Sequence, residues 1–168
     1  MTPQRQAAES AVFQVRYVVP DLEAARAYLE GAFGIGPWLT IPKTRIADRT
    51  YRGKPTPHAY EAVSLAFVGE LQIEIMQPVV GPSIYLDFLK AHPSGGIHHI
   101  AMRTADFDAA VAGMGGAEAV VQSGRVGDFR FAFFDAPALG GAIEVVCLDE
   151  AAQAMLDDFR QANVAVSI

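Results

Sequence analysis

The chain has 168 residues, 51% of them hydrophobic, which is enough for one domain with a substantial core. Its net charge of -6 excludes a general nucleic-acid-binding protein, because such a protein needs a basic surface to replace phosphate counterions. No apolar run approaches the roughly 20 residues that cross a bilayer, so no membrane partner is expected. The polar first ten residues lack the apolar core of a signal peptide, and we therefore expect a cytoplasmic protein.

Alternation of apolar and polar residues predicts strands along most of the chain. The main candidates are residues 12–19, 59–68, 71–76, 97–104, 129–134 and 142–147, with shorter strands near 38–41 and 119–123. Helices are predicted after Asp21 and Asp106, because an aspartate at the cap accepts a free backbone N–H of the first turn. Two more helices are predicted at 83–91 and from about 149 to 162.

One pattern of strands and helix occurs twice. Residues 14–25 correspond to 99–110, and residues 71–75 correspond to 141–145. A repeat of this kind indicates a duplicated module of one strand, one helix and three strands. The expected organisation is a single domain, 1–168, made of a first βαβββ module (12–78), a connecting helix and linker (79–96), a second βαβββ module (97–148), and a C-terminal helix and tail (149–168).

Four polar side chains occupy equivalent strand positions in the two copies. They are Gln14, Glu74, His99 and Glu144. Successive strand residues point to opposite faces, so Gln14 and Glu74 are expected together on the face away from the helices. In the second copy His99 and Glu144 turn the same way, whereas His98 is expected to pack on the helix side. All four can give oxygen or nitrogen to a metal ion, which makes a shared metal site the leading hypothesis.

A basic segment interrupts the first copy. Five of the 13 basic residues lie within twelve positions, at Lys43, Arg45, Arg49, Arg52 and Lys54. The offset between the copies falls from 85 (residue 14 to 99) to 70 (residue 74 to 144), so the first module is about 15 residues longer. Two interpretations stay open: Arg45, Arg49 and Arg52 bind a substrate anion, or the segment is a solvated loop.

Several segments together carry a family resemblance. They are 18–25 (VVPDLEAA), 33–38 (FGIGPW), 73–78 (IEIMQP), 95–100 (GGIHHI) and 143–145 (IEV). In this order and spacing they resemble the vicinal oxygen chelate superfamily, also described as glyoxalase, bleomycin resistance and dioxygenase proteins. Within it, the chain is most similar to methylmalonyl-CoA epimerases and glyoxalase-like proteins over about residues 12–148.

The resemblance implies a fold, a cofactor and site residues. The fold is α+β, with two βαβββ modules forming a curved mixed sheet around a metal cavity, often in a homodimer. The ligand positions carry over to Gln14, Glu74, His99 and Glu144, for one divalent ion (zinc, nickel, cobalt, manganese or magnesium) whose identity the sequence does not give. Glu144 is the first choice for the catalytic base, since in the resembling enzymes the last carboxylate both binds metal and moves protons.

Epimerisation also benefits from a second base on the opposite face of the substrate. The resembling epimerases have an acidic residue near the start of the first module's third strand. Here the candidates are His58 and Glu61, and alternation favours His58, because Glu61 shares its parity with Val63 and Leu65, which are assigned to the helix side.

Three functions follow for a small-molecule substrate such as an acyl-CoA or thiol adduct. The first is a metal-dependent isomerase or epimerase that abstracts a proton next to a carbonyl or thioester. The second is a glyoxalase-type lyase acting on a thiol hemithioacetal, and the third is a non-catalytic binding protein. An extradiol dioxygenase is disfavoured, because that chemistry uses two histidines and one carboxylate on iron, whereas His99 is the one histidine at a ligand position.

Overall fold

The computed structural model describes residues 12–164. The first half of the chain contains β1 (Val12–Val18), α1 (Leu22–Phe33), β2 (Leu39–Ile41), β3 (Ala47–Tyr51), β4 (Lys54–Pro55), β5 (Tyr60–Val68), β6 (Leu71–Val80) and α2 (Ile84–Ala91). The second half contains β7 (Gly96–Arg103), α3 (Phe107–Gly113), β8 (Val120–Val126), β9 (Phe129–Ala136), β10 (Gly141–Cys147) and α4 (Glu150–Val164), with short 3-10 turns at Ala117–Ala119 and Pro137–Leu139.

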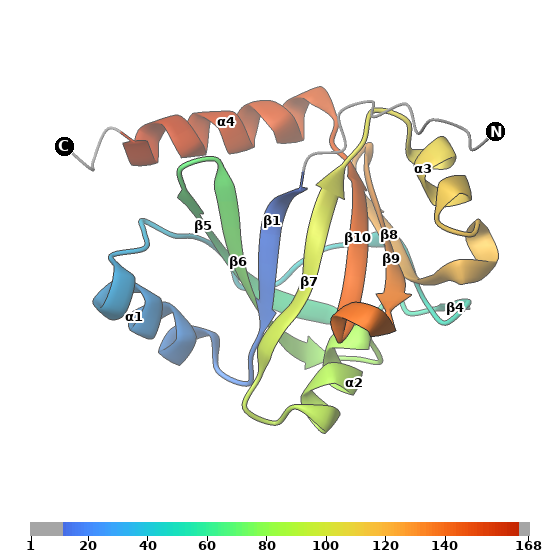
Figure 1. The fold of residues 1–168 in the computed structure, drawn as a ribbon, viewed down its shortest axis with the longest axis horizontal. Coiled ribbons are helices and arrows are strands. Elements are labelled where there is room, and N and C mark those ends of the chain that lie inside the picture. The colour runs from blue at the N-terminus through green and yellow to red at the C-terminus, as the bar shows by residue number, and fades with distance from the viewer. Residues whose placement is uncertain (1–11, 165–168) are drawn as a thin grey trace.

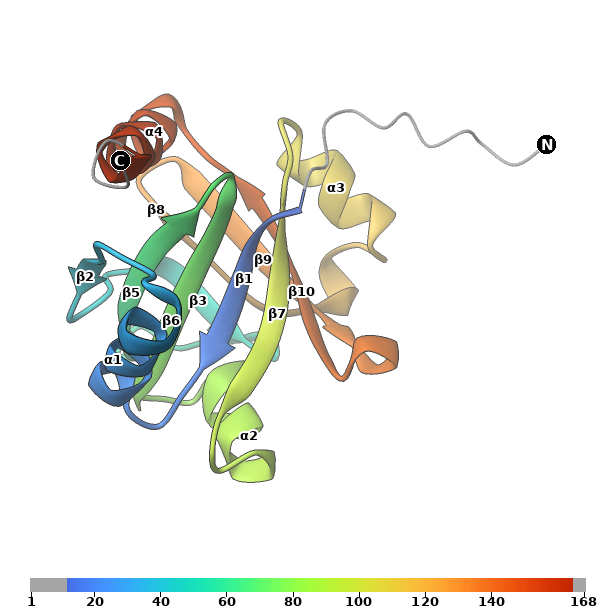
Figure 2. The same ribbon diagram turned by 60° about the vertical axis from the view of Figure 1, so that its left-hand side comes forward.

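All ten strands form one curved mixed sheet in the order β2-β5-β6-β1-β7-β10-β9-β8-β3-β4 (Figures 1 and 2). The two modules meet where β1 pairs antiparallel with β7, and each module has one internal parallel pair, β1 with β6 and β7 with β10. The predicted α+β class, with two βαβββ modules in a curved mixed sheet, is confirmed.

Strand register confirms the internal repeat. Arg16 lies opposite Glu74 in the first parallel pair, and Ala101 lies opposite Glu144 in the second. Gln14 likewise lies opposite Gln72, and the equivalent His99 lies opposite Ala142. The two modules therefore place their carboxylates at the same point of the same framework.

Helices α1 and α3 begin where the sequence predicts. The Asp21 carboxylate accepts the Ala24 N–H at 2.9 Å, and the Asp106 carboxylate accepts the Ala109 N–H at 3.0 Å. Such caps satisfy backbone donors that the first turn leaves free. Both helices pack on the outer face of the sheet, where Leu22 contacts the core of the first module and Phe107 that of the second.

The basic segment forms strands rather than a plain loop. It contributes β3 and β4, and β3 pairs antiparallel with β8 of the second module. The hydroxyls of Thr50 and Ser123 are 2.8 Å apart across this pair. The insertion in the first module therefore extends the sheet at the edge of the second, so that β3 lies far from β5 in the strand order.

One predicted strand face is wrong. Val63 and Leu65 were expected on the helix side of β5, but they line a cavity on the concave side, whereas Ala62 packs with α1. Residues of both parities in β5 are buried, from Glu61 and Val63 to Ser64 and Ala66. Alternation is uninformative in such a strand, because neither face is solvated.

Two further helices lie beyond opposite ends of the strands, α4 at the top and α2 at the bottom of Figure 1. Leu156 of α4 is 8% exposed and contributes to the cavity wall, so α4 covers part of the concave side. Within residues 12–164, none of the helices has the length and apolar character needed to span a membrane.

Candidate active site

The concave side of the sheet encloses a cavity of about 240 Å³. Its walls are apolar and come from both modules and from α4. They include Phe13, Ile46, Val63, Leu65, Met76, Phe129, Phe131, Val146 and Leu156. Polar side chains are confined mainly to one group, Gln14, Arg16, Gln72, Glu74, Tyr85 and Glu144. The cavity therefore suits a small, largely apolar molecule with one polar group.

The four predicted site residues are all buried on this inner side, but they form two separate pairs. In the first, Gln14 donates a hydrogen bond from its amide to Glu74. In the second, His99 Nε2 lies 3.3 Å from Glu144 Oε2. Gln14, Glu74 and Glu144 line the cavity, whereas His99 packs edge-to-face on Phe133 with ring centroids 4.9 Å apart.

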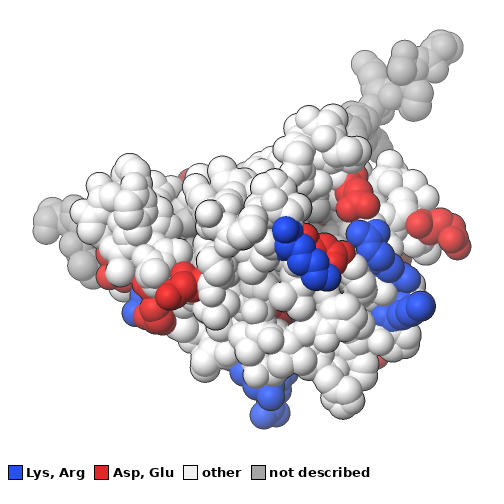
Figure 3. Space-filling model, turned by 90° about the horizontal axis from the view of Figure 1, so that it is seen from below, with Lys and Arg blue, Asp and Glu red and all other residues white. Residues whose placement is uncertain are grey.

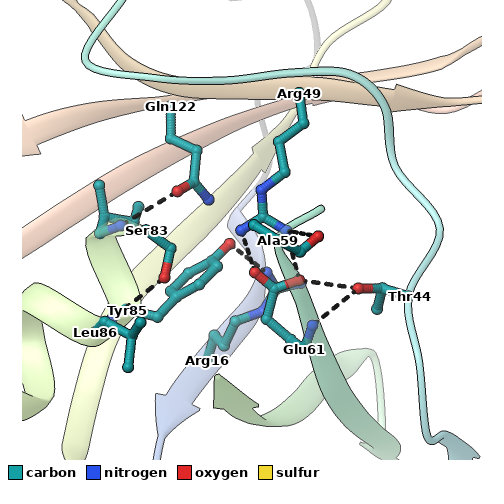
Figure 4. A network of polar contacts seen from close by, with 10 residues as sticks. Arg16, Thr44, Arg49, Ala59, Glu61, Ser83, Tyr85, Leu86 and Gln122 are labelled. Carbon is teal, nitrogen blue, oxygen red and sulfur yellow. Dashed lines mark hydrogen bonds and ion pairs between the residues drawn. The ribbon is translucent and has the colours of Figure 1, made fainter. Parts of the chain in front are cut away.

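Sequence reasoning missed Arg16, although its strand parity placed it on the same face as Gln14. Its Nε donates to Glu74 Oε2 at 3.0 Å, and its Nη2 forms an ion pair with the same oxygen. Its Nη1 lies 3.5 Å from the Tyr85 hydroxyl (Figure 4). Burial lowers the pKa of Arg16, but the charges of Glu74 and Glu144 raise it above its usual range, so the guanidinium stays charged.

One oxygen of the Glu74 carboxylate is occupied by these partners. Its Oε2 accepts from Arg16 Nε, from Arg16 Nη2 and from Gln14 Nε2. Burial raises the pKa of Glu74 and the Arg16 guanidinium opposes that rise; three donated hydrogen bonds favour the ionised carboxylate. Glu74 and Arg16 therefore form a buried ion pair.

Glu144 has no such partner. Burial raises its pKa, and the Arg16 charge offsets only part of this rise. Its Oε2 and the facing His99 Nε2 are both buried without a hydrogen bond. A desolvated carboxylate that lines a cavity and has no hydrogen-bond donor on Oε2 is a candidate for a group that exchanges protons.

The two adjacent histidines are neutral. Burial lowers the pKa of His99 well below its usual range, and together with the neighbouring His99 it lowers that of His98 to about 2. Their Nδ1 atoms are 2.7 Å apart, so one ring donates to the other. His98 also packs on Tyr85 and Phe88, beside His99, rather than turning away from His99 as alternation predicts. The strand pairing shifts by one residue between Arg16–His99 and Tyr17–Ile97. This bulge at His98 lets the rings of His98 and His99 touch.

A second buried ion pair joins Glu61 to Arg49. Both side chains are 1% exposed, and Thr44 donates to Glu61 Oε2 at 2.9 Å (Figure 4). Arg49, predicted to bind a substrate anion, thus directs its guanidinium to Glu61 and to the Ala59 carbonyl at 3.2 Å.

The remaining predicted residues lie at the surface. His58, the favoured second base, is exposed and does not line the apolar cavity; it lies in a groove of about 520 Å³ with Arg52 and Lys54. Arg45 is exposed, and Arg52 approaches Asp87 at 3.6 Å. On the face seen from below, Lys and Arg side chains are scattered and often adjoin Asp or Glu (Figure 3). The roles of His58, Arg45 and Arg52 stay predictions.

The predicted metal ligands do not fit one ion in this arrangement. Gln14 Oε1, His99 Nε2 and Glu144 Oε2 are buried without partners, as free ligand atoms would be. Glu74, however, is neutralised by a guanidinium, and a divalent ion beside it would be repelled by Arg16. Within residues 12–164, no three His, Cys, Asp or Glu side chains lie close enough together to hold a metal ion.

Comparison with known proteins places the chain in a family. Mitochondrial methylmalonyl-CoA epimerase from Bos taurus is 30% identical over 99 residues, which cover 58% of this chain and 48% of that protein. The chain thus spans about half the length of this curated relative.

Solved structures share the fold. Methylmalonyl-CoA epimerase from Mycobacterium tuberculosis superposes with a TM-score of 0.58 at 21% identity, covering 88% of this chain and 95% of that one. A methylmalonyl-CoA epimerase in complex with methylmalonyl-CoA and NH4+ gives a TM-score of 0.58 at 18% identity, with coverages of 85% and 97%. The family model of the Glyoxalase/Bleomycin resistance protein/Dioxygenase superfamily matches residues 13–133, and the chain belongs to this superfamily.

Proposed function

We propose that this chain is an isomerase or epimerase that moves a proton on the carbon next to a carbonyl or thioester. The main support for the proposal is the pairing of the buried carboxylates. Glu74 is paired with Arg16, and Glu61 with Arg49, whereas Glu144 has no cationic partner of its own. Glu144 is therefore the carboxylate that can take up and release a proton.

The reaction follows from this arrangement. Glu144 removes the proton from the carbon, the electrons of the C–H bond form a C=C bond, and the carbonyl oxygen becomes the enolate oxygen. Addition of a proton to the opposite face, from a donor other than Glu144, gives the epimer, and Glu144 releases the proton that it took to solvent. The Tyr85 hydroxyl lines the same cavity, and burial raises its pKa, so it keeps its proton and supplies a donor.

An acyl thioester is the proposed substrate class. The apolar walls suit an acyl group, and the similarity to methylmalonyl-CoA epimerases supports a coenzyme A thioester. The exposed Arg45 and Arg52 would then meet phosphate groups outside the cavity. A cytoplasmic location and a homodimer belong to the same proposal. Metal dependence does not, because Glu74 does not fit a metal site.

The test is exchange of the substrate proton with deuterated solvent across a panel of acyl-CoA thioesters. Wild-type protein should exchange the proton beside the thioester, and Glu144→Gln should lower the rate by about 100-fold or more, because it keeps size but removes the base. Glu118→Gln, at an exposed position, is the control and should exchange normally. Near-normal exchange in Glu144→Gln would exclude Glu144 as the base.

A binding protein without catalytic activity is the second candidate. The Arg16–Glu74 pair favours it, since a guanidinium fixed among apolar walls also suits the binding of an anionic ligand. Saturable binding of an acyl thioester without proton exchange would support this candidate. A glyoxalase-type lyase, the remaining alternative, would convert a thiol hemithioacetal to a thioester, and including such adducts in the panel decides it.

A further inference from the structure

We infer that Arg16 is a built-in cation that takes the place of a divalent metal ion in this cavity and supplies the positive charge facing the substrate's carbonyl oxygen. The inference rests on the proposed function for the nature of that oxygen. It rests on the contacts of Arg16 for everything else.

The internal repeat gives Arg16 an equivalent position in the second module. Arg16 and Ala101 are equivalent, because each lies opposite its module's carboxylate in a parallel strand pair. The alanine adds no polar group, and it leaves Glu144 Oε2 without a donor. The arginine fills the corresponding space in the first module with a guanidinium. The difference between the two carboxylates therefore follows from one residue.

The hydrogen bonds of Glu74 hold Arg16 in place. Two nitrogens of Arg16 and the amide nitrogen of Gln14 converge on Glu74 Oε2. Gln14 Nε2 also donates to Gln72 Oε1, so the Gln14 amide is fixed from both sides. This oxygen has no room for a further ligand. Glu74 Oε2 thus holds the guanidinium, and the Gln14 amide nitrogen is fixed between Glu74 and Gln72, although Gln14 Oε1 has no partner.

Arg16 keeps N–H groups that do not bind Glu74. Its Nη1 makes one long contact, 3.5 Å to the Tyr85 hydroxyl, so it keeps N–H capacity beside the cavity that Arg16 and Tyr85 both line. An N–H donor that is already in place stabilises an oxygen that becomes negative without any reorganisation. As Glu144 takes the proton, the charge that develops on the enolate oxygen lies toward Arg16 and the Tyr85 hydroxyl. The step needs no co-reactant.

The decisive measurement is calorimetric titration of chelator-treated protein with Co²⁺ and with Zn²⁺. Wild-type protein should bind neither ion stoichiometrically, and its proton exchange should be unchanged by EDTA. Arg16→Ala frees the Glu74 carboxylate and vacates the guanidinium's volume, so this variant should gain about one Co²⁺ per chain. Adding Glu74→Gln to Arg16→Ala should abolish that gain, whereas adding the exposed Glu118→Gln should not. Stoichiometric binding by wild type that is lost in Glu74→Gln would overturn the inference.

A conservative series separates charge from geometry. Arg16→Met should lower proton exchange by about 100-fold, the usual cost of one oxyanion donor. Arg16→Lys should recover part of that loss, because it restores the charge but not the planar fork. Equal rates for the methionine and lysine variants would contradict a charge at this position.

If Arg16→Ala does not fold, the titration of wild-type protein with Co²⁺ and Zn²⁺ still decides the question. Inactivity of wild type on every thioester would remove the proposed function but leave the metal titrations valid.

Discussion

The two modules share one strand framework but give their equivalent carboxylates opposite surroundings. In the first module Glu74 receives two nitrogens of Arg16 and the amide of Gln14. In the second, Glu144 faces a neutral histidine and the methyl group of Ala101 lies where Arg16 would be. One duplicated position thus became a fixed ion pair, and the other stayed a titratable group.

Two modules with the same strand geometry can therefore hold equivalent carboxylates in different states. A symmetric pair of modules, each with a glutamate and a neutral ligand, would place two free carboxylates at one cavity. An arginine in one module neutralises one of them and adds a donor for an anionic oxygen. In the proposed function, the acid–base group Glu144 and the charge-stabilising group Arg16 come from different modules, and both line the cavity.

The largest expected effect is on stability, and it compares the two glutamates directly. Glu74→Gln removes the partner of a buried guanidinium, so the free energy of unfolding should fall by about 3–5 kcal/mol. Glu144→Gln replaces a buried carboxylate without a hydrogen-bond donor by a neutral amide, so it removes a desolvation cost and should not lower the free energy of unfolding. Urea unfolding at pH 7 measures both. Equal losses in the two variants would contradict the asymmetry between the modules.

The sequence predicts the residues on this face of the sheet, but it does not predict which of the two glutamates is paired. Period-two alternation placed Gln14, Glu74, His99 and Glu144 on one face, and all four are buried on the inner side of the sheet. Parity also put Arg16 on that face. Its contact with Glu74 depends on the register of β1 against β6, which alternation does not determine.

Other errors have similar causes. The pairing of β3 with β8 joins residues more than 70 positions apart, at Thr50 and Ser123, and no local pattern specifies such a partner. Glu61 was assigned to the helix side from its shared parity with Val63 and Leu65. That assignment fails because β5 is buried on both faces. A basic run is read as surface by default, yet Arg49 is 2% exposed because Glu61 neutralises it.

A smaller effect should appear in the pH dependence of the same two proteins. The pKa of Glu144 is raised in the folded state above the value of about 4.3 for an unfolded glutamate. The unfolded chain therefore loses this proton first as pH rises, and wild-type protein loses stability between about pH 4.3 and the folded pKa. Glu144→Gln lacks this titration, so its stability relative to wild type should rise through that window by about 1.4 kcal/mol per unit of pKa shift.

Unfolding at half-unit steps from pH 4 to 8 measures this difference. Because every other titrating group is shared by the two proteins, its contribution cancels in the comparison. Glu118→Gln, at an exposed position, serves as the control and should follow wild type throughout. A constant difference between Glu144→Gln and wild type across the range would show that Glu144 is not desolvated in the folded protein.

The smallest expected effect concerns the surface of β3 and β4, where the first module extends past the second. Arg45→Gln with Arg52→Gln should raise KM for a coenzyme A thioester by about five-fold at low salt, since an exposed ion pair contributes no more than about 1 kcal/mol. The value of kcat should hold, because charges on a remote phosphate act equally on the ground state and the transition state.

Arg49 is left unchanged, since its guanidinium is buried against Glu61. Arg125→Gln, which removes an exposed arginine that pairs with Asp48, is the matched control. The rise in KM should shrink at 0.5 M salt, where such attractions are screened. A KM equal to that of wild type at low salt would assign β3 and β4 a structural part alone, as the edge that extends the sheet beyond β8.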